Sequence, residues 1–234
     1  MSDSPTVVLV HGAFADASGY AGVIASLEAD GITVVAPPNP LRSLTIDANS
    51  IAAVVAAIDG PVVLVGHSYG GAVITQASAG LSNVKSLVYL AAFGIDVGES
   101  AGSVTAPFPP SMLATTATPT PYDAVGSPGG PELYISKEGF HATFCADLPD
   151  VQAAAMYATQ RPLAIVALTE NATAAGWKTI ASWFLVSDHD NAISPEAEAF
   201  MADRMKATTE HIDGSHVAFI SHADAVAAFI KKAL

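Results

Sequence analysis

The sequence predicts an α/β protein with a doubly wound, mostly parallel six-stranded sheet and an inserted helical cap. Three observations carry this prediction. Short apolar runs alternate with helical patterns, one run ends in a Gly-X-Ser-X-Gly turn, and a proline-rich stretch interrupts the alternation. Strands that alternate with helices form parallel sheets with right-handed crossovers. The 234 residues, 51% of them hydrophobic, are enough for one large core.

Six runs rich in apolar residues are the expected strands. Most are continuously apolar rather than alternating, which is typical of strands covered by helices on both faces. The runs span residues 6–10, 32–36, 62–65, 86–91, 181–186 and 208–212. Their spacing leaves room for a helix in most of the connections.

Helical patterns fill these connections. The expected helices span residues 18–30, 45–58, 69–80, 195–206 and 223–233. Ser194, Pro195 and Glu196 supply an N-cap residue, a proline at the first helical position and an early acid. Gly31 and Gly60 are helix stop signals.

The third run leads directly into Gly66-His67-Ser68-Tyr69-Gly70. A strand, a sharp turn and a helix are the context in which this pattern forms a nucleophile elbow. The turn strains the serine backbone and needs small residues at 66 and 70, where a Cβ would collide with neighbouring segments. We therefore expect the Ser68 hydroxyl to be exposed at the carboxyl edge of the sheet.

Residues 96–162 contain most of the prolines and are too long for an ordinary connection. Apolar and aromatic residues are scattered through them, which favours a packed cap over disorder. The predicted organisation is a core of residues 1–95 and 163–234 with a cap at 96–162.

Serine is a weak nucleophile and needs a base, which in turn needs an acid to orient it. His216 is the candidate base because it directly follows the last predicted strand in a glycine-containing loop. Asp188 and Asp190 both follow the fifth strand, so both are candidate acids. All these loops belong to the edge where open α/β sheets bind ligands.

An oxyanion hole is expected at the same edge. Gly12 and Ala13 follow the first strand, and they lie beside Ser68 if the first and third strands are neighbours. The backbone N–H groups of Ala13 and Tyr69 would then face the reacting carbonyl oxygen. Loss of one such donor typically lowers turnover by ~10²–10³.

These residues resemble the α/β-hydrolase superfamily over essentially the whole chain, without its two leading antiparallel strands. Within it, the chain is similar to the small esterase-type branch related to plant methyl esterases and hydroxynitrile lyases. The resemblance favours Asp190 as the acid, because residues 190–193 match the family's Asp-X-X-Val/Ile-Pro-like turn better than the residues after Asp188 do. Asp188 is the alternative, and Asp96, where some members place the acid, is a third option.

The resemblance implies a serine hydrolase that cleaves a small, largely uncharged ester through an acyl-enzyme on Ser68, without cofactor or metal. Hydroxynitrile lyases of this branch have threonine and lysine where this chain has Gly12 and Val217, which disfavours that activity. The same triad also fits hydrolysis of a lactone or an amide or cleavage of a C–C bond. A non-catalytic ligand-binding protein on the same fold is a further alternative.

Composition restricts the partners. A net charge of −13 with nine Lys and Arg residues argues against nucleic acid or an anionic membrane as a partner. No apolar run approaches membrane-spanning length, and the first residues lack a signal-peptide pattern, so we expect a cytoplasmic protein. The single Cys145 excludes an intramolecular disulfide. The expected partner is a small-molecule ester, and the apolar excess also allows a homodimer.

Overall fold

The computed structural model describes residues 4–123 and 129–234. Its main sheet has six parallel strands in the order β2-β1-β3-β4-β8-β9. The strands are β1 (Thr6–Val10), β2 (Val34–Val35), β3 (Val62–Ser68), β4 (Val84–Ala92), β8 (Ala181–Ser187) and β9 (Thr208–Ile212). The predicted doubly wound parallel sheet is therefore confirmed.

The winding direction reverses at β1, which pairs with β2 on one side and β3 on the other. Val10 at the end of β1 lies opposite Gly66 in β3. The carboxyl ends of β1 and β3 are thus neighbours, as the argument for the oxyanion hole requires. Ligands of open α/β sheets bind at this kind of reversal.

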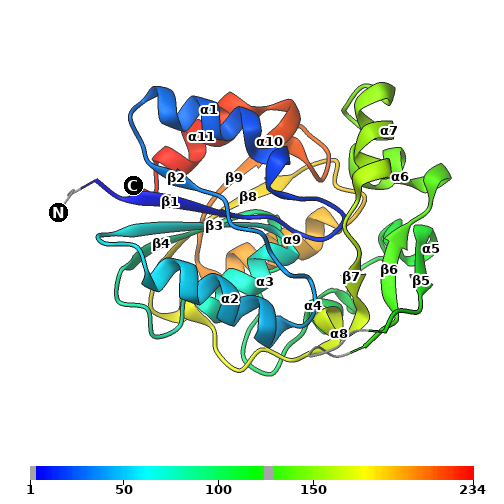
Figure 1. The fold of residues 1–234 in the computed structure, drawn as a ribbon, viewed down its shortest axis with the longest axis horizontal. Helices are drawn as coiled ribbons and strands as arrows, with labels where there is room; N and C mark the ends of the chain where they lie inside the picture. The colour runs from blue at the N-terminus through cyan, green and yellow to red at the C-terminus, as the bar shows by residue number, and fades with distance from the viewer. Residues whose placement is uncertain (1–3, 124–128) are drawn as a thin grey trace.

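Helices cover both faces of the sheet. The core helices are η1 (Ala17–Tyr20), α1 (Ala21–Ala29), α2 (Leu44–Ala56), α3 (Tyr69–Ala77), η2 (Gly176–Lys178), α9 (Pro195–Met205), α10 (Ala218–Ser221) and α11 (Ala223–Lys231). Helices α1 and α11 pack together on one face, and α2 and α3 pack together on the other (Figure 1). The strands between them are buried and form the centre of one hydrophobic core.

The segment between β4 and η2 lies at the carboxyl edge of the sheet (Figure 1). It contains α4 (Ala101–Thr105), α5 (Leu113–Thr116), β5 (Ala117–Thr120), β6 (Glu132–Ile135), α6 (Lys137–Phe144), α7 (Asp150–Thr159), β7 (Leu163–Ala164) and α8 (Ile165–Thr169). The cap contains strands besides the predicted helices, because β5, β6 and β7 form an antiparallel sheet. Pairing of Leu133 with Leu163 also carries this unit past the expected boundary at residue 162. Residues 124–128 of the predicted cap lie outside the described residues.

Two local predictions also need correction. The sequence predicts the second strand at residues 32–36, but only Val34–Val35 pair with β1. Helix α9 begins at Pro195 as predicted, yet the Ser194 hydroxyl bonds the Glu196 carboxylate at 2.6 Å instead of capping the helix.

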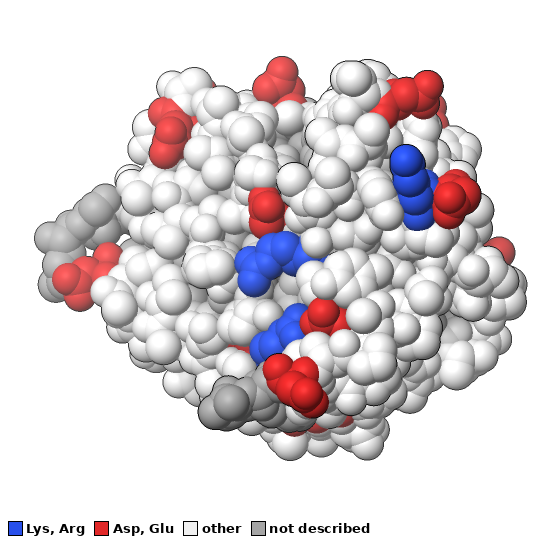
Figure 2. All heavy atoms as spheres, turned by 45° about the vertical axis from the view of Figure 1, so that its right-hand side comes forward, with Lys and Arg blue, Asp and Glu red and all other residues white. Residues whose placement is uncertain are grey.

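The surface around the cap is sparsely charged. In Figure 2 the basic side chains lie beside acidic ones and do not gather into a patch. Among the described residues, no helix has both the length and the apolar character needed to cross a membrane.

Candidate active site

Ser68 occupies the turn between β3 and α3, with φ 54° and ψ −125°. This left-handed φ is unfavourable for a residue with a Cβ, and it is the strained conformation expected of a nucleophile elbow. The side chain is almost buried but lines a cavity at the carboxyl edge of the sheet.

Close backbone approach explains two glycines around Ser68. A Cβ at Gly12 would lie 2.6 Å from the Ser68 Cβ and 3.2 Å from its Oγ. A Cβ at Gly70 would overlap the Val10 carbonyl oxygen at the end of β1. Only glycine at these positions lets the β1 loop and α3 meet the serine without displacement.

His216 and Asp190 form a buried pair. The Nδ1–H of His216 donates to Asp190 Oδ2 at 2.5 Å, and the two side chains are 1% and 0% exposed. The other carboxylate oxygen of Asp190 accepts the N–H groups of Ala192 at 2.6 Å and Ile193 at 2.8 Å. These bonds fix the carboxylate in the loop after β8 and leave Nε2 as the remaining ring nitrogen of His216.

The two other candidate acids lie elsewhere. Asp188 contacts His211 Nδ1 at 2.7 Å on the exposed side of β9. Asp96 pairs with Lys178 at 2.6 Å. The structure therefore brings Asp190 to His216 and leaves Asp188 and Asp96 apart from it.

His67, next to Ser68, connects the elbow to the histidine loop. Its Nε2–H donates to the His216 carbonyl oxygen at 2.8 Å, and the two imidazole centroids are 4.6 Å apart. Burial, followed by the neighbouring His216, lowers the pKa of His67 well below its ordinary value. A neutral His67 thus holds the His216 backbone beside the nucleophile.

No hydrogen bond joins Ser68 Oγ to His216 within the described parts of the chain. Such bonds are often long without substrate and shorten only in the reacting complex. The contact through His67 still places the imidazole next to the elbow.

Ala13 and Ser68 line the same cavity, as does Tyr69. The Tyr69 N–H is the first of α3 and has no helical acceptor. The loop that carries Ala13 is fixed by His11, whose Nε2 accepts the Asn39 N–H at 3.0 Å. Burial lowers the pKa of His11, consistent with this acceptor role.

The cavity at Ser68 has a volume of about 230 Å³. Apolar side chains from α5, β5, β6, β7 and α8 form its outer wall: Leu113, Ala114, Ala117, Leu133, Leu163 and Leu168. None of its lining residues is charged. The volume is below the range of drug-sized sites, so the cavity suits a small apolar group.

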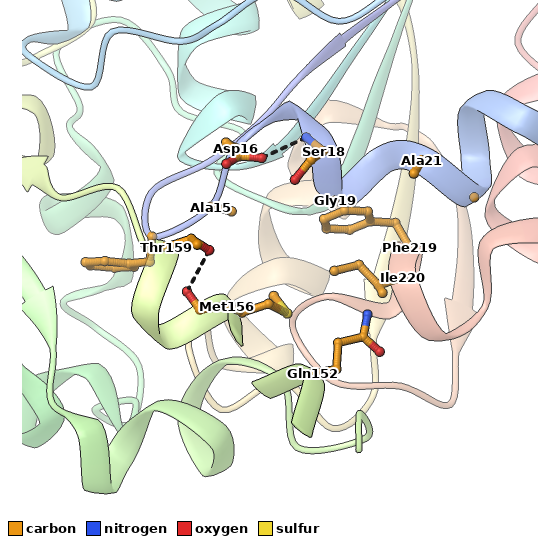
Figure 3. A pocket seen from close by; sticks show the side chains of 12 residues that line it. Ala15, Asp16, Ser18, Gly19, Ala21, Gln152, Met156, Thr159, Phe219 and Ile220 are labelled. Atoms are coloured by element: carbon orange, nitrogen blue, oxygen red, sulfur yellow. Dashed lines mark hydrogen bonds between the residues drawn. The ribbon is translucent and has the colours of Figure 1, made fainter. Parts of the chain in front are cut away.

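A second cavity, of about 270 Å³, lies between η1, α7 and α10 (Figure 3). Asp16 and Ser18 face Met156 and Gln152 across it. Phe14 lines both cavities, but Ser68 lines only the first. The second cavity therefore lies outside the candidate active site.

Three carboxylates near the site were not predicted from the sequence. Asp47 on α2 accepts the Tyr69 hydroxyl at 2.8 Å, and burial raises its pKa to about 6. Asp147, between α6 and α7, accepts hydrogen bonds from Ser215, the residue before His216. Glu198 on α9 is completely buried next to Asp190. Asp47 and Glu198 occupy positions in the apolar stripes of their helices. An acid at such a position indicates a buried carboxylate, so the sequence pattern could have revealed both.

No group of three or more His, Cys, Asp or Glu side chains suited to a metal occurs in the described part of the chain. Cys145 directly follows α6 in the cap and is buried, and burial raises the pKa of its thiol to about 12. It is therefore not an activated nucleophile.

Comparison with known proteins gives a family match. The model of the "Alpha/beta hydrolase family" matches residues 7–229. "Alpha/beta hydrolase nvfD" of Aspergillus novofumigatus is 26% identical over 98% of this chain and 96% of that protein.

Solved structures share the fold. A mutant of polyneuridine aldehyde esterase superposes with a TM-score of 0.84 at 15% identity, covering 98% of both chains. The methylesterase MES16 from Arabidopsis gives 0.80 at 17% identity, again over 98% of both chains. At these identities the likeness shows the fold alone.

Proposed function

The chain belongs to the alpha/beta hydrolase family, and on that basis we propose that it is a serine hydrolase of small, largely uncharged carboxylic esters. The observation that carries the proposal is the buried 2.5 Å contact between His216 and Asp190, beside a serine held in a left-handed turn. A base oriented by a buried acid is what a serine needs to become nucleophilic.

In the proposed reaction, Ser68 Oγ attacks the acyl carbon while His216 Nε2 takes the hydroxyl proton. The Ala13 and Tyr69 N–H groups donate to the oxyanion that forms. His216 then protonates the departing alcohol, which leaves an acyl group on Ser68. Water, deprotonated by His216, releases the carboxylic acid and restores the serine.

Asp190 has two roles in this scheme. Its Oδ2 holds the proton on Nδ1, so that Nε2 is the basic nitrogen, and its charge stabilises the imidazolium. The backbone N–H groups of Ala192 and Ile193 keep that carboxylate in place during the cycle.

The lining of the cavity supports the substrate class. Leu113, Leu133 and Leu168 line the same cavity as Ser68 and offer no partner to a charged substrate. A charged group there would lose hydration without compensation. The cap segment thus selects the substrate, whereas the core carries out the chemistry.

The test combines a covalent probe with ester turnover. A fluorophosphonate should add one phosphonyl group to the wild type at Ser68, as read by intact mass and peptide mapping. Hydrolysis of p-nitrophenyl esters from acetate to octanoate should fall by ~10⁴-fold or more in Ser68→Ala. Ser82→Ala is the matched control, because Ser82 is an exposed serine before β4, outside the cavity.

Different outcomes separate the alternatives. Labelling of Ser68 without ester turnover would favour a lactone, amide or C–C bond as the substrate. Neither labelling nor turnover would refute the proposed nucleophile and favour a ligand-binding protein. The cytoplasmic location and the homodimer stay predictions, and light scattering tests the latter.

A further inference from the structure

Glu198 is an acid in an unexpected place. It lies on α9, three, four and seven positions before Met201, Ala202 and Met205, all buried against the core. Its side chain is completely buried. A buried acid needs compensating hydrogen bonds or charges, or it keeps its proton.

Only one of its two oxygens is compensated. Oε2 accepts the Ser187 N–H at the end of β8, at 3.2 Å. Oε1 has no hydrogen-bond partner among the described residues. In the same described set, no lysine or arginine pairs with Glu198.

The groups that face Glu198 are acidic. Asp190 is held next to it through Ser187, whose N–H donates to Glu198 and whose carbonyl oxygen accepts the Asp190 N–H at 3.2 Å. The charges of Asp190 and Asp188 both act on Glu198. Beyond Asp190 lies His216, whose ring is engaged with Asp190, while Asp188 is paired with His211. A second buried negative charge beside Asp190 would therefore face repulsion without a cation of its own.

Burial first, and then the charge and hydrogen bond of Asp190, raise the pKa of Glu198 well above its ordinary value. The Ser187 N–H opposes this shift but does not reverse it. A neutral carboxylic acid has an O–H donor, which an ionised one lacks. Protonation at Oε1 would satisfy the oxygen that has no partner.

We propose that Glu198 is a positioning residue of the triad, a neutral carboxylic acid whose Oε1–H donates a hydrogen bond to the Asp190 carboxylate. The inference rests on the proposed hydrolase function for its kinetic consequences, but not for the hydrogen bond itself. The bond adds a third kind of donor to Asp190, beside the Ala192 and Ile193 N–H groups and the His216 ring.

The role has a defined consequence for His216. A donor to Asp190 disperses part of its negative charge and fixes the orientation of the carboxylate. Without it, Asp190 attracts the imidazolium more strongly and is free to rotate, so His216 should become more basic but less well oriented.

Two substitutions separate a neutral donor from an ionised acid. Glu198→Gln keeps an amide oxygen for the Ser187 N–H and an NH₂ donor for Asp190. It should therefore leave kcat/KM and the acidic limb of its pH profile nearly unchanged. Glu198→Ala removes the donor, so kcat/KM should fall by about 10–100-fold, with the acidic limb moved to higher pH. Glu196→Gln, an exposed acid on the same helix, is the matched control.

Infrared spectroscopy tests the hydrogen bond without turnover. The C=O stretching band of a protonated carboxylic acid should be present at pH 7 in the wild type and absent in Glu198→Gln. Glu196→Gln should retain the band. This readout stands even if Glu198→Ala does not fold or if no ester is hydrolysed, so failure of the proposed function is distinguishable from failure of this inference.

Two results would overturn the inference. One is a shift of the acidic limb to lower pH in Glu198→Gln, together with no infrared band, because that pattern means that an ionised Glu198 has been neutralised. The other is a folded Glu198→Ala with unchanged kcat/KM and pH profile, which would leave Glu198 with a packing role only.

Discussion

The Tyr69 hydroxyl donates a 2.8 Å hydrogen bond to the Asp47 carboxylate, which lies on a different helix. Tyr69 follows the proposed nucleophile, and its N–H is a proposed oxyanion donor. Both oxygens of Asp47 also accept the Arg42 N–H, at 3.0 and 3.1 Å. The elbow is thus attached to α2 through one largely buried acid.

This acid should make stability depend on pH. Burial raises the pKa of Asp47 from 3.8 to about 6, so the folded chain retains a proton that the unfolded chain has lost. The free energy of unfolding should therefore fall as pH rises through this window, by about 2–3 kcal/mol. Asp47→Asn cannot ionise and should lose this part of the slope. Urea unfolding at several pH values measures it, with the exposed Asp59→Asn as control; parallel curves for wild type and Asp47→Asn would contradict the prediction.

The two neighbouring acids after β8 should differ in their effect on turnover. Asp190→Asn should lower kcat by about 10³–10⁴-fold, because an amide no longer fixes the Nδ1–H tautomer of His216. Asp188→Asn should stay within about threefold of wild type, since it loses only an exposed contact with His211. The measurement is kcat of both variants and the wild type on one ester by steady-state kinetics. Equal losses in both variants would disprove the assignment of Asp190.

Much of this arrangement is predictable from the sequence because it follows from strand ends. Residues 62–71 predict the elbow, and parallel strands then bring Gly12, Ser68 and His216 to one edge. The choice between Asp188 and Asp190 is not a matter of periodicity, since both follow the same strand. The resemblance to the family favours Asp190 in advance. The physical reason, that its carboxylate receives the Ala192 and Ile193 N–H groups, is a turn geometry that the structure adds.

The cap was less predictable for a physical reason. Its strands are short, and Leu133 pairs with Leu163 across an intervening pair of helices, so no local pattern reveals the sheet. Asp47 and Glu198 are recognisable in the sequence as acids within apolar stripes. Their partners are not, because Tyr69 is distant from Asp47 in the sequence and Asp190 lies in the loop before the helix of Glu198.

Asp147 connects the cap to the histidine loop, and its loss should impair catalysis. Its carboxylate accepts the Ser215 hydroxyl at 2.5 Å, the Ser215 N–H at 3.0 Å and the Ser221 hydroxyl at 2.6 Å. Burial alone would raise its pKa, but these bonds together lower it. The stabilisation is therefore present above the ordinary carboxyl pKa and lost as pH falls through the lower folded value.

Asp147→Ala should lower kcat by about tenfold, because the loop that carries His216 loses three hydrogen bonds. Asp150→Ala is the control, since Asp150 begins the next helix of the cap and contacts only His141 among the described ion pairs. The measurement is kcat and KM for a short ester at pH 7. A change confined to KM would mean that Asp147 shapes the substrate cavity and not the position of His216.

Gly12→Ala should abolish most of the activity while the sheet stays folded. The added methyl group would lie 2.6 Å from Ser68 Cβ and 2.8 Å from the His67 carbonyl oxygen, both on the rigid elbow. Because neither neighbour is the end of a flexible side chain, the β1 loop must move away and take the Ala13 N–H with it. Loss of one oxyanion donor predicts a fall in kcat of about 10²–10³-fold.

The matched control is Gly102→Ala. Its methyl group would meet only the Leu168 carbonyl oxygen at 3.3 Å and the Ser100 hydroxyl at 4.0 Å. Circular dichroism should show the same fold for both variants. Full activity in a folded Gly12→Ala would exclude the Ala13 N–H from the oxyanion hole, because that donor cannot keep its place beside Ser68 once residue 12 carries a side chain.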